Sequence, residues 1–147
     1  MAEMCNEITC DLLHFALKKG LADANIEWVC APVPNSLIKI IGEKLSGACL
    51  QRAYNASDLK EAVGTFDFAP ISWRENLENI LDAFTAELSK TNLKEIVVSI
   101  VLFAQLLVKR ALEEGHRSIA DSIVHECIVH INMYCLPCAT GWENLFL

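Results

Sequence analysis

The stretch Ile96-Val-Val-Ser-Ile-Val-Leu-Phe-Ala-Gln-Leu-Leu-Val108 decides the fold, because it is apolar on nearly every face of a helix. Ser99 and Gln105 are its polar residues. A helix that is apolar all round is surrounded either by protein or by lipid. These 13 residues are too few to cross a bilayer, which takes about 20. We therefore expect a buried central helix, over about residues 93–111, with amphipathic helices around it.

The sequence after this helix predicts a partner for it. Lys109 and Arg110 give the central helix a basic last turn, and Gly115 is a suitable stop. Ser118 is a suitable N-cap for a further helix, whose apolar residues recur every three or four positions. Those residues are Ile119, Ile123, Val124, Cys127, Ile128 and Ile131. The two helices should pair as a hairpin.

Amphipathic helices are also predicted before the central helix. The first covers about residues 7–19, with Asn6 as its cap and Gly20 as its stop. The second carries an apolar stripe of Leu37, Ile38, Ile41, Leu45, Cys49 and Leu50. Gly42 lies within that stripe, and because a helical glycine costs about 0.5–1 kcal/mol against alanine, we expect a close helix contact there.

Two further helices follow. A short one begins near Ser57 and is interrupted at Gly64, and a longer one begins at Ser72, which with Glu75 has the spacing of a capping box. In the longer helix Leu77, Ile80, Leu81, Phe84 and Leu88 recur at helical spacing.

Composition supports one all-α domain over residues 1–147. The chain is 53% apolar with four prolines and six glycines, and its apolar runs lack the frequent turns of an all-β protein. The net charge of −7, with scattered lysines and arginines, argues against nucleic-acid binding. Seven cysteines are an odd number, and several fall in apolar helical stretches, so we expect reduced thiols in the cytosol or nucleus.

Four segments resemble the homology regions of pro-survival Bcl-2 proteins, in the family order. Residues 8–20 (ITCDLLHFALKKG) are similar to the fourth region, and residues 38–45 (IKIIGEKL), followed by Arg-Ala-Tyr at 52–54, to the third. Residues 87–97 contain Glu-Leu and Asn-Leu-Lys-Glu-Ile-Val, which resemble part of the first region. Gly-Trp-Glu at 141–143 resembles the second region.

This resemblance implies a Bcl-2-like bundle that inhibits apoptosis by holding the amphipathic death-motif helix of a pro-apoptotic relative in a hydrophobic groove. It implies neither catalysis nor a metal or other cofactor. The positions that match the family's groove are Leu45, Cys49, Leu59, Phe84, Leu88, Asn92, Leu93, Lys94, Glu95, Val97 and Val98.

The chain departs from the family where the groove should be cationic. The family arginine that pairs with the ligand's aspartate falls on Glu95, and the adjacent glycine falls on Lys94. A carboxylate facing a carboxylate repels, so we expect a narrow ligand range unless Lys94, Lys90 or Arg74 pairs with the ligand.

A second departure is compactness. The loop between the first two helices is short, and we expect no membrane anchor and no integral membrane segment. Both features resemble virally encoded homologues and indicate a soluble protein of the host cytoplasm, recruited to mitochondria through partners. An exposed groove on such a chain would also allow homodimerisation.

Two other readings stay open. A Bcl-2-like regulatory module could use the same fold for a non-apoptotic host partner, and Glu95 favours this alternative. The second reading is a zinc or thiol site at Cys127, His130, Cys135 and Cys138, with His125 nearby, because a Cys-x-x-Cys pair follows a cysteine and a histidine on one helix face. Buried thiols are the simpler interpretation of these cysteines.

Overall fold

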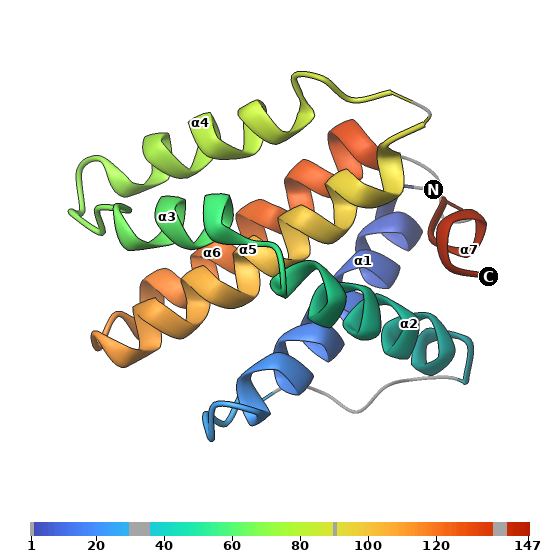
Figure 1. Ribbon diagram of the computed structural model, residues 1–147, viewed down its shortest axis with the longest axis horizontal. Coiled ribbons are helices and arrows are strands. Elements are labelled where there is room, and N and C mark those ends of the chain that lie inside the picture. The colour runs from blue at the N-terminus through green and yellow to red at the C-terminus, as the bar shows by residue number, and fades with distance from the viewer. Residues whose placement is uncertain (1, 30–35, 90, 137–140) are drawn as a thin grey trace.

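Every regular element that the structure describes is a helix, which confirms the predicted all-α class (Figure 1). The structure is a computed structural model and describes residues 2–29, 36–89, 91–136 and 141–147, with the backbone alone for residues 2–7. Its helices are α1 (Ala2–Ala22), α2 (Ser36–Ala53), α3 (Ser57–Gly64), α4 (Trp73–Thr85), α5 (Leu93–Glu113), α6 (Arg117–His130), the π-helical η1 (Ile131–Cys135) and α7 (Gly141–Phe146).

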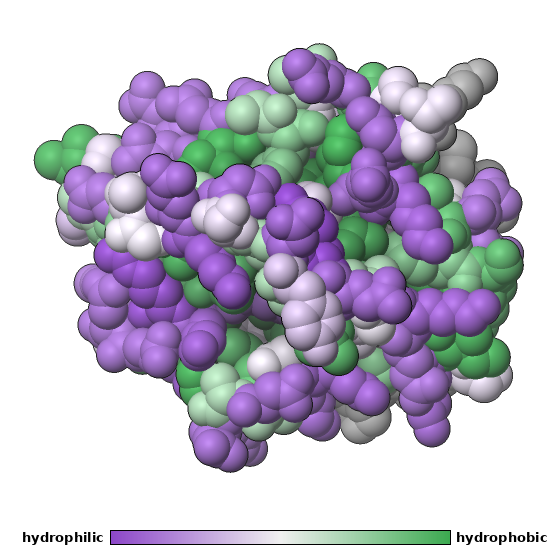
Figure 2. All heavy atoms as spheres, viewed as in Figure 1, coloured by the Kyte–Doolittle hydropathy of each residue, from purple (hydrophilic) through white to green (hydrophobic). Residues whose placement is uncertain are grey.

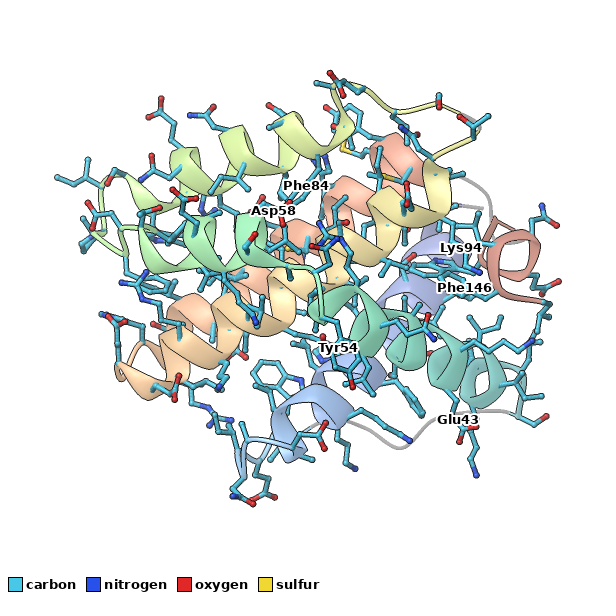
Figure 3. The ribbon with its side chains drawn as sticks, in the orientation of Figure 1. Glu43, Tyr54, Asp58, Phe84, Lys94 and Phe146 are labelled. Atoms are coloured by element: carbon cyan, nitrogen blue, oxygen red, sulfur yellow. The ribbon has the colours of Figure 1, made fainter. Side chains whose placement is uncertain are left out.

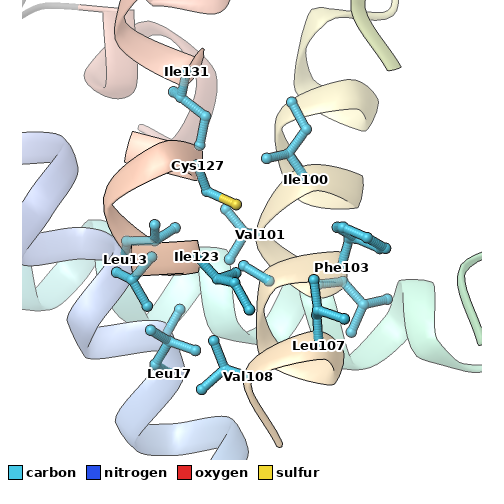
Figure 4. Packing of buried hydrophobic residues seen from close by; sticks show 14 of the residues in the cluster. Leu13, Leu17, Ile100, Val101, Phe103, Leu107, Val108, Ile123, Cys127 and Ile131 are labelled. Carbon is cyan, nitrogen blue, oxygen red and sulfur yellow. The ribbon is translucent and has the colours of Figure 1, made fainter. Parts of the chain in front are cut away.

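Helix α5 is the buried central helix that its sequence predicts. From Val97 to Val108 every residue but Leu106 is buried, and α1, α2, α3, α4 and α6 all pack against it. Figure 4 shows Leu13 and Leu17 of α1, Ile123 of α6 and Val101 and Val108 of α5 gathered in one buried cluster. The buried side chains of these helices form a single cluster, so α5 lies at the centre of one shared core. Burying a Val, Leu, Ile or Phe side chain completely contributes about 1.5–3 kcal/mol to stability. Among the described residues, no helix combines the length and apolar character needed to span a membrane.

The predicted hairpin of α5 and α6 is confirmed, together with its glycine stop. Gly115 has φ of +82°, and its N–H donates to the Leu112 carbonyl at 3.2 Å. The His116 N–H donates to the Ala111 carbonyl at 2.7 Å. These two bonds form a Schellman ending, in which a left-handed glycine satisfies the last carbonyls. Figure 1 shows α5 and α6 running side by side.

Of the two serine caps predicted from the sequence, Ser118 is wrong, whereas Ser72 is confirmed as the N-cap residue of α4 but not as a capping box. Helix α6 begins at Arg117 with His116 at the N-cap position, because His116 directly follows the Schellman turn and its carbonyl accepts from the Ala120 N–H at 3.0 Å. Ser72 does stand at the N-cap of α4, yet its side chain makes no capping bond. The turn before α4 already closes with the Trp73 N–H donating to the Ala69 carbonyl at 3.0 Å, so the helix starts without the hydroxyl.

Helix α1 is longer than predicted at both ends, and neither Asn6 nor Gly20 is a boundary. The helix continues through Gly20, and this glycine marks a close contact with α5, because an added Cβ would lie 2.8 Å from Nε2 of Gln105. The actual stop is Asn25, which has φ of +60°. The Ile26 N–H donates to the Leu21 carbonyl at 2.9 Å, which is again a Schellman ending, with asparagine in place of glycine.

Helix α7 is held to the start of the chain by a buried hydrogen-bond relay. The Trp142 indole N–H donates to Thr9 Oγ1 at 2.9 Å, and the Thr9 hydroxyl donates to Asn132 Oδ1 at 2.6 Å. Trp142 is 1% exposed and its ring stacks on Phe146. The Gly-Trp-Glu segment therefore has a structural role, joining α7 to α1 and η1.

Candidate helix-binding groove

Five of the predicted groove residues lie inside the core. Each is at most 5% exposed and belongs to the single cluster of buried apolar side chains. They are Leu45, Cys49, Leu59, Val97 and Val98. A helix bound between α3 and α4 could touch Leu45, Leu59, Val97 and Val98 only after the helices that cover them had moved apart. Burial also raises the pKa of the Cys49 thiol to about 12, so this side chain acts as a small apolar group.

Three other predicted anchors, Phe84, Leu88 and Leu93, are half-buried and pack on the edge of the core. Phe84 projects from α4 toward α5 (Figure 3), where its ring meets that of Phe103 edge-on with centroids 5.7 Å apart. These residues are accessible from the surface without unfolding the core, since they lie at or next to the ends of α4 and α5.

A hollow of about 390 Å³ separates α3 from α4 near the loop that joins them. Its lining is mixed: Ala62, Phe66 and Ile80 are apolar, and Thr65, Asp67, Asn76 and Asn79 are polar. Helix α3 packs on α5, and α4 packs on α5 and α6. Figure 2 shows that polar side chains cover most of this face of the molecule and that apolar side chains reach the surface between them. The hollow is the point where a helix could begin to enter.

A polar depression of about 540 Å³ lies where the α2–α3 turn meets the start of α5. Arg52, Asp58, Asn92 and Glu95 are among its lining residues. Arg52 forms an ion pair with Asp58 at 3.1 Å, and its Nε donates to Ser99 Oγ at 3.3 Å. Slight burial would raise the pKa of Asp58, but the hydrogen bonds from Arg52 and from the Leu59 backbone outweigh it and lower that pKa. Glu95 is exposed.

The cations expected to replace the family arginine have other contacts. Lys94 lies with its ammonium nitrogen 5.1 Å from the centroid of the Phe146 ring (Figure 3). Arg74 lies over the Trp73 ring and 3.7 Å from a carboxylate oxygen of Glu126. Lys90 is outside the described residues.

Arg52 lies in the same depression as Glu95. The sequence analysis did not predict Arg52 as a cation of the candidate site. The Arg-Ala-Tyr match at 52–54 could have pointed to Arg52. However, Arg52 is about 40 residues from the start of α5 in the sequence, so its position beside that helix could not be predicted.

Asn92 fixes the loop before α5. Its Oδ1 accepts from the Ser89 N–H at 2.7 Å, and its Nδ2 donates to the Glu87 carbonyl at 2.9 Å. Asn92 therefore has a structural role in this depression, and its side-chain amide is already bonded at both ends.

Among the residues that the structure describes, no three histidine, cysteine, aspartate or glutamate side chains lie close enough together to hold a metal ion. Cys127 and Cys135 are buried, and burial raises their pKa values to about 12 and about 11. His130 is buried, with Nε2 3.2 Å from Thr85 Oγ1. His125 is exposed, and Cys138, the remaining residue of the zinc and redox alternatives, is outside the described residues. The described thiols are poor nucleophiles, since the thiolate is the reactive form.

The chain was also compared with known proteins. No protein-family model matches it, and no curated protein matches it significantly.

Proposed function

We propose that this chain is a Bcl-2-like binding protein that inhibits apoptosis in the cytoplasm by sequestering the amphipathic death-motif helix of a pro-apoptotic relative. Three features support the proposal: the four similar segments in family order, the buried central helix α5, and the hollow between α3 and α4. The hollow carries the argument, because a helix-in-groove binder needs an entry between two helices that rest on a shared floor.

In this proposal, binding replaces apolar contacts of α3 with apolar contacts of the ligand helix. Of the five α-helices that pack on α5, namely α1, α2, α3, α4 and α6, the eight-residue α3 is the shortest, so it is the cheapest of them to displace. A ligand helix between α3 and α4 would then contact Leu59, Phe84 and Val97. The ligand's anchor side chains, spaced three or four residues apart, would each contribute about 1.5–3 kcal/mol by burying apolar surface. The sum of these contributions must exceed the free-energy cost of moving α3.

Glu95 makes the proposed ligand range narrow. A death-motif aspartate arriving at the start of α5 would face this exposed carboxylate. Arg52 is the cation in the same depression, but Asp58 already holds it. A ligand that draws Arg52 away from Asp58, or that carries a neutral or basic residue at this position, is favoured over the ordinary aspartate-bearing helices.

A second candidate function is a Bcl-2-like regulatory module for a non-apoptotic host partner. The observation that favours it is the closed state of the groove, with five of the predicted anchors in the core. Under this alternative the working surface is the exterior of the bundle, and no death-motif peptide binds.

The test is calorimetric titration of the full chain with a panel of death-motif helices. We expect saturable binding of one or a few peptides, lost when the peptide's apolar anchors are changed to glutamate. Glu95→Arg should tighten binding of aspartate-bearing peptides about tenfold or more, the effect of exchanging repulsion for a charge-assisted hydrogen bond.

Glu75→Arg is the matched control, because it makes the same charge change on the exposed first turn of α4. Equal gains from the two variants would show that net charge, and not position 95, controls affinity. An absence of binding at micromolar concentrations, by the native chain and by Glu95→Arg alike, would leave the regulatory-module alternative.

A further inference from the structure

A second hollow lies between the end of α1, the second half of α2 and the middle of α5. Its volume is about 560 Å³. Small-molecule sites typically measure about 300–1,000 Å³. We name it the α1–α2–α5 pocket. Among the predicted groove residues only Cys49 lines it, so it is separate from the surface to which the proposed function applies.

The floor and one wall of this pocket are apolar. Leu102 and Leu106 of α5 and Cys49 and Leu50 of α2 line it. Leu50 is 58% exposed, so the apolar surface continues from the pocket to the outside of the bundle. Gly47 lies on the α2 wall, and an added Cβ there would meet nothing within 4 Å. The pocket can therefore take an apolar chain whose end emerges beside Leu50.

Two uncharged polar side chains, Ser46 and Gln105, also line the pocket. Ser46 lines it, and the Ser46 Oγ is buried without a hydrogen-bond partner among the described residues. An enclosed hydroxyl without a partner is unfavourable, because it has given up its bonds to water. Gln105 also lines the pocket, and its Nε2 donates to the Ala16 carbonyl at 2.7 Å, which fixes the amide.

Charges of both signs stand at the pocket. Lys19 of α1 and Lys109 of α5 bring ammonium groups, and Asp23 and Glu43 bring carboxylates. Within the described part of the chain, none of the four takes part in an ion pair. Lys19 lies 5.7 Å from the centroid of the Phe15 ring, a contact that leaves its N–H donors available. The lining is electrically balanced, with both signs unpaired, and this favours a ligand that itself carries both charges.

We propose that the α1–α2–α5 pocket binds a single-chain amphiphile with a zwitterionic headgroup, as in a lysophospholipid of the choline type. The acyl chain lies along Leu102, Leu106 and Leu50. The phosphate accepts hydrogen bonds from the two lysines, and the ammonium faces the two carboxylates. Charge-assisted hydrogen bonds of this kind are stronger than neutral ones, so the headgroup determines selectivity.

The experiment titrates octylphosphocholine, below its micelle-forming concentration, into the full chain labelled with ¹⁵N. We expect saturable amide shifts confined to the end of α1, the second half of α2 and the middle of α5. Octyl glucoside, which has the same chain and a neutral headgroup, should cause much smaller shifts. Equal binding of the two amphiphiles would overturn the headgroup assignment, and an absence of saturable shifts with octylphosphocholine would overturn the proposal.

Two pairs of variants place the site. Gly47→Leu should abolish the shifts by filling the pocket, and it should remain folded because leucine is a better helix former than glycine. Gly64→Leu is its control, since a Cβ at Gly64 also meets nothing within 4 Å but lies on α3. Lys19→Gln should weaken binding about tenfold, with the exposed neighbour Lys18→Gln as control. Unchanged binding by Gly47→Leu would place the amphiphile elsewhere and overturn the assignment.

Discussion

Gly42 of α2 lies directly against the aromatic ring of Phe15 of α1. A Cβ added to Gly42 would stand 2.6 Å from Cδ1 and 2.8 Å from Cγ of that ring, closer than carbon atoms approach. The glycine inside the apolar stripe of α2 predicted a close helix contact, and this prediction is confirmed. The partner, however, could not be read from the sequence, because nothing in it says which helix crosses α2 at this point.

Gly42→Ala should destabilise the protein although alanine is the better helix former. The gain in helix propensity is about 1 kcal/mol, whereas forcing a methyl into a packed site typically costs about 1–3 kcal/mol. Gly47→Ala, in the same helix but facing open space, should stabilise by about 0.5–1 kcal/mol. Urea denaturation of both variants measures the difference. Equal stabilisation by the two substitutions would show that Phe15 moves aside without cost.

The elements that the sequence predicted best are those that depend on local chemistry. The apolar run of α5 excludes water on every side, and Gly115 adopts a left-handed conformation that other residues resist, so both predictions hold without knowledge of any neighbour. Asn6, Gly20, Ser72 and Ser118 also had suitable local chemistry. Ser72 is indeed the N-cap of α4, although without a capping bond. Asn6 and Gly20 lie inside α1, and Ser118 lies inside α6 because the Schellman turn before it sets the start of that helix at Arg117.

The candidate site was less predictable than the fold. Apolar spacing marks a residue as buried on binding or buried in the core, and it cannot separate the two. The resemblance predicts Leu45 and Val97 as ligand anchors, and both are fully buried here. The pairing of Arg52 with Asp58 beside Glu95 depends on how α2, α3 and α5 meet, which no local pattern encodes.

Thr9→Val should loosen α7, because it removes the acceptor of the Trp142 indole and the donor to Asn132 at once. Leaving a buried polar group without a partner costs about 1–3 kcal/mol. We expect a loss of that size in the free energy of unfolding, measured by urea denaturation. Thr65→Val is the control, since the exposed Thr65 hydroxyl bonds only to carbonyls of its own helix. Losses of equal size in both variants would argue against a structural relay through Thr9.

Acidification should destabilise the fold through His14 and His130. Burial lowers the pKa of both imidazoles, and the nearby carboxylates of Asp11 and Asp121 for His14, and of Asp82 for His130, offset this only in part. In addition, the His14 Nδ1 accepts from the Trp28 indole at 3.0 Å, a bond that protonation of Nδ1 removes.

The sign of this effect follows from proton linkage. Below the unfolded-state pKa of about 6.5, the two histidines are protonated in the unfolded chain but remain largely neutral in the folded chain. The unfolded state therefore binds more protons, and the free energy of unfolding decreases as pH falls. Urea midpoints should be constant between about pH 7.5 and 8, below the range in which unfolded thiols ionise, and should decrease between about pH 6.5 and 5. His14→Gln should flatten part of that decrease, whereas the exposed His125→Gln should leave it unchanged. A profile that His14→Gln does not alter would contradict the role of this histidine.

Arg110→Met should release the α3–α4 loop from the end of α5. The Arg110 guanidinium donates to the carbonyls of Val63 and Phe66, pairs with Glu114 at 2.6 Å and lies over the Phe68 ring. Methionine keeps the apolar length of the side chain but donates no hydrogen bond, so two carbonyls lose their partner. We expect faster amide hydrogen exchange at residues 62–69 by about tenfold or more, since each charged hydrogen bond contributes about 1.5–3 kcal/mol.

If opening of the loop also precedes ligand entry, peptide association should become faster. Arg117→Met, at the exposed start of α6, is the control and should change neither rate. Unchanged exchange over residues 62–69 would show that the loop is held by its own aromatic packing and that Arg110 does not restrain it.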